Sequence, residues 1–281
     1  MTSLDALLPR LSALLDRLEG APATPIDWKK TLAAKWLAGS QGFKPILHPY
    51  AMPFDALHGI DEQKQRVDAN TRQFVAGKPA NNVLLTGARG CGKSSLVRAM
   101  LTRYGKRGLR VIEVDKTGLT HLPDILAQLE GLPQKFILYC DDLSFAEHET
   151  GYAELKAALD GSLAGPLDNV LIYATSNRRH LLPEYYAENE ATKHVGEEIH
   201  AAEAVEEKIS LSDRFGLWVS FYAMDQDVYL TVAREWAQRL GAKDTDSERF
   251  TRAALQWSLS RSARSGRVAH QFARDWAGQG K

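Results

Sequence analysis

The chain has 281 residues, of which 44% are hydrophobic, so its length allows one large domain or two small ones with a buried core. Lysine plus arginine and aspartate plus glutamate each total 35, and this zero formal charge argues against nucleic-acid binding over the whole surface. We expect a cytoplasmic protein without a membrane partner, because the chain has only two cysteines, no apolar run of ~18 residues and no secretory signal at its N-terminus.

The first 53 residues are expected to form an N-terminal helical extension and a connector. Seven leucines share one helical stripe over residues 3–19, which predicts a helix buried either on its own domain or against a neighbouring subunit. A second helix is predicted over Asp27–Leu37, where two tryptophans and a leucine recur every four residues. Prolines in Gly39–Phe54 predict an extended connector.

Residues 54–222 alternate between helical and strand patterns, beginning with a helix near Asp61–Val75. The strand candidates are Val83–Leu85, Arg110–Val114, Phe136–Cys140, Val170–Ala174 and Leu217–Phe221. Helical stretches between these strands predict an α/β fold with a mostly parallel sheet covered on both faces. Residues 223–281 show no strand pattern and form a separate helical unit, with helices predicted over Asp227–Leu240, Ser247–Ser260 and Arg267–Ala277.

The segment Gly87–Ser94 fits the phosphate-loop pattern G-x-x-x-x-G-K-[ST], and it lies between a predicted strand and a predicted helix, as this pattern requires. Glycines allow consecutive backbone N–H groups to turn toward a phosphate. We expect Lys93 to reach the β- and γ-phosphates and the hydroxyl of Ser94 to complete a Mg²⁺ shell. The residues predicted to bind the nucleoside triphosphate are Gly87, Ala88, Arg89, Gly90, Cys91, Gly92, Lys93, Ser94 and Ser95.

Polar side chains follow two of the buried strands. Asp141 and Asp142 end one strand, at the edge where open α/β sheets bind ligands. We expect Asp141 to hold Mg²⁺ and Asp142 to orient or deprotonate the attacking water. Asn177 ends the next strand, and its amide can position a water against the γ-phosphate. The alternative roles are a helix cap for a strand-end aspartate and the start of a turn for the asparagine.

Two arginines near the ends of predicted elements are further candidates for the site. Arg214 precedes the last strand, and Arg267 begins the last helix. Either residue could be only a solvated surface arginine. In a functional site, Arg214 would stabilise charge on the phosphoryl group in a neighbouring subunit, and Arg267 would fold back onto the γ-phosphate.

The order of these parts resembles that of AAA+ ATPases, over the range from about Leu57 to Trp276. In that superfamily the parts are the Walker A loop, Walker B, sensor 1, the arginine finger and sensor 2, which match Gly87–Ser94, Asp141 with Asp142, Asn177, Arg214 and Arg267 respectively. The segment that contains Ile60 resembles the one that lines the adenine, with Ile60 against the base. The resemblance implies a P-loop NTPase sheet with a C-terminal helical lid.

Three strings are more specific: Pro79–Leu85, Cys140–Phe145 and Ala174–Leu181 look like a bacterial AAA+ family of unknown function. The Asp-Asp ending also resembles the replication-initiator branch, whereas most AAA+ proteins carry glutamate at the second position. The resemblance implies ATP and Mg²⁺ as cofactors, and a nucleotide-dependent homo-oligomer that hydrolyses ATP to remodel or load an unknown protein or nucleic-acid client. The alternative is a low-turnover ATP-dependent switch or adaptor that binds a protein or DNA partner, which is consistent with Asp142.

Two further segments bear on the client. Residues 183–210 hold eight glutamates against two lysines, and this acidic insert is either a solvated helical excursion or a recognition site for a basic or protein partner. The segment between Val114 and Leu122 lacks the aromatic–apolar pair that threading unfoldases present to their pore. This composition disfavours a polypeptide threader.

Overall fold

The computed structural model of the protein describes residues 26–145, 150–160, 167–177 and 211–280. The leucine-rich helix predicted over residues 3–19 and the acidic insert predicted at residues 183–210 lie outside these residues. None of the helices described has the length and apolar character that a membrane crossing requires.

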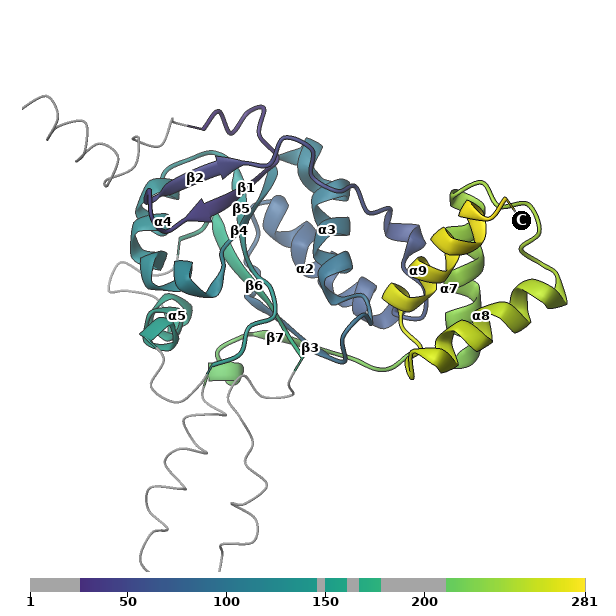
Figure 1. The fold of residues 1–281 in the computed structure, drawn as a ribbon. Coiled ribbons are helices and arrows are strands. Elements are labelled where there is room, and N and C mark those ends of the chain that lie inside the picture. Colours follow the sequence, from purple (N-terminus) through teal and green to yellow (C-terminus); the bar gives the residue numbers. More distant parts are fainter. Residues whose placement is uncertain (1–25, 146–149, 161–166, 178–210, 281) are drawn as a thin grey trace, which may run out of the picture.

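A seven-stranded sheet forms the centre of the described structure, with its strands in the spatial order β2-β1-β4-β5-β6-β3-β7 (Figure 1). The strands are β1 (Ala33–Leu37), β2 (Gly42–Pro45), β3 (Val83–Gly87), β4 (Leu109–Glu113), β5 (Lys135–Cys140), β6 (Val170–Ser176) and β7 (Leu217–Phe221). Neighbouring strands are parallel, except that β1 and β2 pair antiparallel. The carboxyl ends of the parallel strands therefore meet along one edge.

Helices cover both faces of this sheet, with α2 and α3 on one face and α4 and α5 on the other (Figure 1). The α-helices are α2 (Asp61–Val75), α3 (Lys93–Tyr104), α4 (Leu122–Leu129), α5 (Thr150–Asp160), α7 (Gln226–Arg239), α8 (Glu248–Ser260) and α9 (Gly266–Gly278). Short 3₁₀ helices are η1 (Phe54–Ala56), η2 (Gly105–Arg107) and η3 (Lys116–His121). The predicted mixed α/β fold is thus confirmed.

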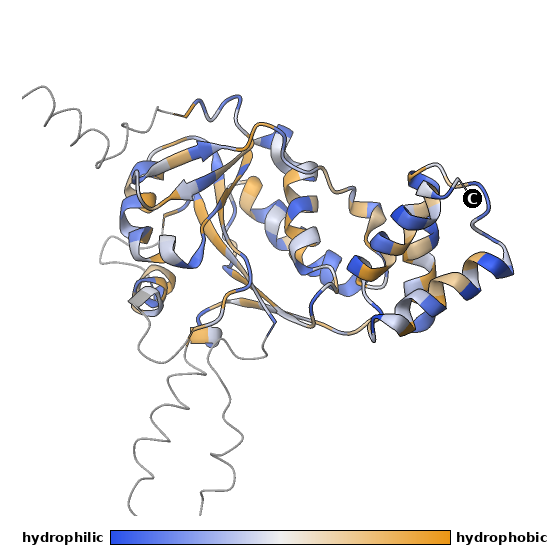
Figure 2. Cartoon of the chain, viewed as in Figure 1, coloured by the Kyte–Doolittle hydropathy of each residue, from blue (hydrophilic) through white to orange (hydrophobic). Residues whose placement is uncertain are grey.

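The central strand β3 shows why the sheet is buried on both sides. Val83 and Leu85 pack in the apolar cluster that contains α2 and α3, whereas Leu84 packs in the cluster that contains α4 and α5. All three side chains are fully buried, as expected for a parallel strand between two helical layers. Figure 2 shows the same pattern, with hydrophobic strands between helices that turn hydrophilic faces outward. The strands predicted from Val83 onward are confirmed.

The helix predicted over Asp27–Leu37 is wrong, because the second half of this range is the strand β1. Ala34 and Trp36 are buried on one face of the sheet and Ala33 on the other, which is the two-residue alternation of a strand. A repeat of four residues fits both periods, so it does not distinguish a helix from a strand. Strand β2 likewise occupies part of the predicted connector, and both strands extend the sheet beyond β4.

The three helices after β7, which we call the lid helices, have an apolar core of their own built around Tyr229, Phe250 and Phe272. Each begins after a capping side chain. Asp225, Ser247 and Ser265 accept hydrogen bonds from the backbone N–H three residues later, at 2.8, 3.1 and 3.3 Å respectively. Figure 1 shows these helices beside α2 and α3, away from α4 and α5.

Candidate functional site

The carboxyl ends of β3, β5 and β6 lie next to one another, because the sheet order places β6 between the other two strands. A cavity of about 680 Å³ lies at this edge and reaches the lid helices. The residues that line it include Ile60, Arg89, Gly90, Cys91, Gly92, Lys93, Ser94, Ser95, Asp141, Asp142, Thr175, Asn177 and Arg267. The fold therefore brings the predicted site residues to one cavity, except for Gly87, Ala88 and Arg214.

The loop Gly87–Ser94 depends on glycine at two close approaches. Gly87 has a φ of +134°, and a Cβ atom there would lie 2.1 Å from the carbonyl oxygen of Phe221. Gly90 has a φ of +79°, and a Cβ atom there would lie 2.8 Å from Oγ of Ser265. Because a side chain at either position would be both strained and crowded, glycine lets the loop pass close to β7 and to the lid helices.

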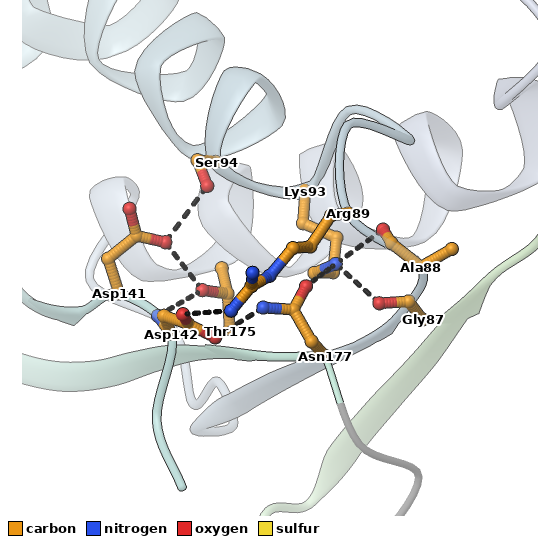
Figure 3. Close-up of polar contacts among 9 residues, drawn as sticks. All are labelled: Gly87, Ala88, Arg89, Lys93, Ser94, Asp141, Asp142, Thr175 and Asn177. Carbon is orange, nitrogen blue, oxygen red and sulfur yellow. Dashed lines mark hydrogen bonds and ion pairs between the residues drawn. The ribbon is translucent and has the colours of Figure 1, made fainter. Parts of the chain in front are cut away.

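Lys93 is only 6% exposed, and its ammonium group lies inside the loop (Figure 3). Nζ donates hydrogen bonds to the carbonyl oxygens of Gly87 at 2.6 Å and Ala88 at 2.8 Å. It also donates to Oδ1 of Asn177, at 3.1 Å. The loop therefore holds a buried positive charge beside its own backbone, which is what binding of a phosphate group requires.

Ser94 and Asp141 face each other across the cavity floor. The hydroxyl of Ser94 donates to Oδ1 of Asp141 at 2.9 Å, and the hydroxyl of Thr175 donates to the same oxygen at 2.6 Å (Figure 3). Burial raises the pKa of Asp141, but the nearby hydroxyls of Thr175, Tyr139 and Ser94 and the charge of Arg98 together hold the pKa below its ordinary value. Asp141 is therefore ionised at neutral pH, as an oxygen ligand of a metal ion must be.

Asp142 has a φ of +52°, in the left-handed region that residues other than glycine rarely adopt. Its backbone N–H donates to Oγ1 of Thr175 at 2.9 Å. Its carboxylate accepts hydrogen bonds from the amide of Asn177 and, at 3.4 Å, from the guanidinium of Arg89. Asp142 thus contacts both the phosphate loop and the end of β6.

Sequence reasoning missed Thr175, which contacts both carboxylate residues and is 1% exposed. It lies in β6, two positions before Asn177, which follows the strand, and residues two apart along a strand share a face of the sheet. That spacing is the signal in the sequence that could have identified it.

The other end of the cavity is apolar. It is lined by Ile60 and Met52 from the segment before α2 and by Val232, Trp236 and His270 from the lid helices. The rings of Trp236 and His270 meet edge to face, with their centroids 4.6 Å apart. Burial and the nearby positive charge of Arg274 lower the pKa of His270, so its ring is neutral at physiological pH. This end can accept a flat, uncharged ring.

The lid helices contact the phosphate loop directly. The backbone N–H of Gly266, at the start of α9, donates to the carbonyl oxygen of Gly90 at 2.9 Å. Arg267 follows Gly266 and lines the cavity. Nε2 of His58 lies 2.7 Å from a carboxylate oxygen of Glu235, and this contact joins the segment before α2 to the lid helix α7. The lid helices are thus docked over the cavity.

Arg214 lies apart from this cavity. Its Nε atom lies 2.6 Å from Oδ1 of Asp160, at the end of α5. Arg214 precedes the amino end of β7, and it lines a second cavity, of about 1040 Å³, with Asn81 and Gly216. The cavity with the phosphate loop lies at the carboxyl ends of the strands. The structure therefore separates Arg214 from the other predicted site residues of the same chain.

A parallel sheet with a glycine-rich loop after β3, two carboxylates after β5, an asparagine after β6 and a helical lid is the architecture of an AAA+ P-loop ATPase. The chain belongs to the family described as "Protein of unknown function (DUF815)", whose model matches residues 29–280. The resemblance to an AAA+ family of unknown function is thereby confirmed. No curated protein matches the chain.

Solved structures with a similar fold include the replication initiator DnaA bound to AMPPCP and single-stranded DNA, at 15% identity and a TM-score of 0.53, over 79% of this chain and 63% of that one. Trip13 in the HORMA:CdnC:Trip13 complex of E. coli MS115-1 is 14% identical, with a TM-score of 0.49 over 79% of this chain and 89% of that one. The Thermotoga maritima RuvB Holliday junction branch migration motor is 14% identical, with a TM-score of 0.44 over 79% and 70% of the two chains. At these identities the likeness is one of fold.

Proposed function

We propose that the protein binds ATP with Mg²⁺ in the cavity beside the phosphate loop and hydrolyses it. The observation that carries the proposal is an unbroken chain of hydrogen bonds that runs from Lys93 through Asn177, Asp142, Thr175 and Asp141 to Ser94. A glycine-rich turn with only a structural role gives no reason to gather an ammonium group, two carboxylates and an amide at one sheet edge. A site for a triphosphate and a water molecule needs all of them.

The phosphates would lie against the loop and the first turn of α3. Backbone N–H groups there, and the positive end of the α3 dipole, would bind the phosphate oxygens. Lys93 would exchange its hydrogen bonds to the carbonyl oxygens of Gly87 and Ala88 for bonds to the β- and γ-phosphates. The remaining loop residues would surround the triphosphate, as the sequence pattern predicts.

The residues at the cavity floor fit Mg²⁺. The hydroxyl of Ser94 and the carboxylate of Asp141 are oxygen donors of the kind that Mg²⁺ prefers, and they lie 2.9 Å apart. When bound, Mg²⁺ would supply positive charge that offsets the negative charge of the phosphates. Ser94 and Asp141 would hold it.

Asp142 and Asn177 would orient the attacking water. The water oxygen would form a bond to the γ-phosphorus as the bond to the bridging oxygen breaks, and the carboxylate of Asp142 would take up a proton of the water. The amide of Asn177 lies between Lys93 and Asp142, so it can position the water relative to the γ-phosphate. Arg267, from the lid helix α9, would contact the γ-phosphate from the opposite side.

The apolar end of the cavity would hold the adenine, with Ile60 against the base. Ile60 is 5% exposed, and it packs 3.3 Å from the position that a Cβ atom would take on Gly92. This contact places an apolar side chain directly beside the phosphate loop. One nucleotide could therefore place its base against Ile60 and its phosphates in the loop.

We further propose that the protein acts as a homo-oligomer in which Arg214 completes the site of a neighbouring subunit. Its separation from the cavity of its own chain supports this role. An oligomeric ATPase of this kind would remodel or load a protein or nucleic-acid client. Single-stranded DNA is the first client to test, because DnaA carries it in a structure of similar fold.

A low-turnover ATP-dependent switch is the second candidate function, and Asp142 favours it. Aspartate is one methylene shorter than glutamate, so it reaches less far toward a water. In addition, the carboxylate already has two partners, Arg89 and Asn177. A protein of this kind would bind a protein or DNA partner in its ATP-bound state and release phosphate only slowly.

Phosphate release at saturating Mg·ATP tests the proposal. Asp142→Asn keeps the size of the side chain but removes the base, so it should lower turnover by about 10²-fold or more while ATP still binds. Asp227→Asn, at an exposed position of α7, is the matched control and should behave like the wild type. Wild-type turnover no faster than that of Asp142→Asn, with normal ATP binding, would favour the switch.

A further inference from the structure

Thr175 makes contacts with three consecutive residues at the end of β5. Its hydroxyl donates to Oδ1 of Asp141 at 2.6 Å, and it accepts a hydrogen bond from the backbone N–H of Asp142 at 2.9 Å. Its carbonyl oxygen accepts a hydrogen bond from the backbone N–H of Leu143, at 2.6 Å. One residue of β6 thus contacts three consecutive residues of the turn that carries the two carboxylates, and Figure 3 shows its contacts with Asp141 and Asp142.

The sheet register explains why Thr175 can contact all three of these residues. The last paired residues of β5 and β6 are Cys140 and Ala174, so the next residues, Asp141 and Thr175, lie side by side where the ladder ends. Beyond this point the chain turns away, and Asp142 takes a left-handed backbone conformation with a φ of +52°. The hydroxyl of Thr175 receives the N–H of Asp142 at this turn.

Burial makes this hydroxyl hard to replace. Thr175 is 1% exposed, so water has little access to take over a lost hydrogen bond. Oδ1 of Asp141 accepts hydrogen bonds from both Thr175 and Ser94, and two hydroxyl donors on one oxygen restrict the rotation of the carboxylate. The contacts therefore orient a side chain and a strained backbone at the same time.

We propose that Thr175 is a positioning residue that holds Asp141 toward Ser94 and fixes the backbone of Asp142. This inference rests on the proposed function, since it assigns Thr175 a role toward the Mg²⁺ ligand and the water-orienting carboxylate. The proposal assigns Thr175 no direct contact with the nucleotide or the ion. It acts through the two aspartates, as residues that orient metal ligands do.

The test compares Thr175→Val, which removes the hydroxyl and keeps the branched shape, with Thr175→Ser, which keeps the hydroxyl. Two quantities are measured on the full chain: the affinity for labelled ATP in EDTA, and the Mg²⁺ concentration that half-saturates the gain in ATP affinity. Turnover at saturating Mg·ATP is the third readout. Thr71→Val is the matched control, because it removes an equally buried hydroxyl from α2, where that group contacts Val67 and Tyr173.

We expect Thr175→Val to need about tenfold more Mg²⁺ and to lose about tenfold or more in kcat. Its affinity for ATP in EDTA should stay within about twofold of the wild type, since the phosphate loop is unchanged. Thr175→Ser should recover both losses to within about threefold, and Thr71→Val should match the wild type in all three readouts. If Thr175 had a purely structural role, Thr175→Ser would not recover the Mg²⁺ dependence and the kcat that Thr175→Val loses.

Wild-type Mg²⁺ dependence and turnover in Thr175→Val would overturn the inference and leave the proposed function intact. Absence of ATP binding by the wild type would instead overturn the proposed function, and the inference with it. If Thr175→Val does not fold, as circular dichroism would show, Thr175→Ala is measured in its place. Failure of both variants to fold, while Thr71→Val folds, would assign Thr175 a structural role and overturn the inference.

Discussion

The ammonium of Lys93 and the amide oxygen of Asn177 lie 3.1 Å apart, although 84 positions separate the two residues in the chain. The amide nitrogen of the same asparagine donates to the carboxylate of Asp142. Asn177 therefore stands between a cation and an anion and uses both ends of its amide. An asparagine side chain suits this position because it is neutral and has a donor and an acceptor.

Asn177→Ala should lower kcat by about 10²-fold, because it removes the group that links the lysine to the water-orienting carboxylate. ATP affinity should change by less than about fivefold, since the phosphate loop is unaltered. Steady-state turnover and equilibrium ATP binding, measured on the same preparation, separate the two effects. An unchanged kcat would remove Asn177 from the proposed mechanism.

Arg214→Ala should bind ATP like the wild type and lose roughly 10³-fold in turnover, because the arginine would act in the site of a neighbour. Mixing this variant with Lys93→Ala should restore part of the turnover, since some interfaces then pair an intact phosphate loop with an intact Arg214. Arg72→Ala, at an exposed arginine near the end of α2, is the control. Wild-type turnover in Arg214→Ala alone would refute the assignment.

The two serine caps of the lid helices offer a matched pair. Ser265→Ala and Ser247→Ala each remove an N-cap and should each lower the free energy of unfolding by about 1 kcal/mol. Only Ser265 packs against Gly90, so only its variant should also weaken ATP binding, by about threefold to tenfold. Thermal unfolding and ATP titration check the two parts separately. Equal ATP affinities in the two variants would show that the start of α9 does not support the phosphate loop.

The pKa of Asp141 is lowered in the folded protein, so folding favours its ionised form. The contribution of this carboxylate to stability is therefore fully present above the pKa of the unfolded chain, near 3.8, and is lost as the pH falls through the lower folded value. The difference in unfolding free energy between the wild type and Asp141→Asn should be constant from pH 7 to about pH 5. Below about pH 4 the wild type should lose stability relative to Asp141→Asn, because its carboxylate becomes protonated. A difference that does not vary with pH would contradict the lowered pKa.

Elements whose signal is local could be predicted from the sequence. Strands such as β3 and β5 are continuous apolar runs, and the glycine pattern of Gly87–Ser94 fixes a loop by itself. The strand β1 could not be predicted, because its pairing with β4 is what makes it a strand. Arg110, on β4, contributes to this region by donating to the carbonyl oxygen of Trp28 at 2.6 Å, a contact that no local pattern shows.

The candidate site also contains residues that the local sequence identifies and residues that only the tertiary structure brings to the site. A lysine in the phosphate loop, and aspartate and asparagine just after strands, indicate their chemistry by residue type, so these residues could be named from the sequence. Thr175 was missed although it lies two positions before Asn177, because a threonine within a strand is also what β-propensity favours. Only the register of β5 against β6 places its hydroxyl beside Asp141. The pairing of Arg89 with Asp142 was hidden for the same reason, since it depends on where the loop after β3 meets the turn after β5.

Equilibrium titration of labelled ATP into the wild type and into Lys93→Ala tests the central claim most directly. The wild type should bind ATP saturably, with one site per chain. Lys93→Ala should bind ATP about 10- to 100-fold more weakly, because it loses the hydrogen bonds between the buried ammonium group and the phosphates. Lys78→Ala, at an exposed lysine away from the phosphate loop, should match the wild type. Absence of saturable uptake, or equal affinity in the wild type and Lys93→Ala, would contradict the account.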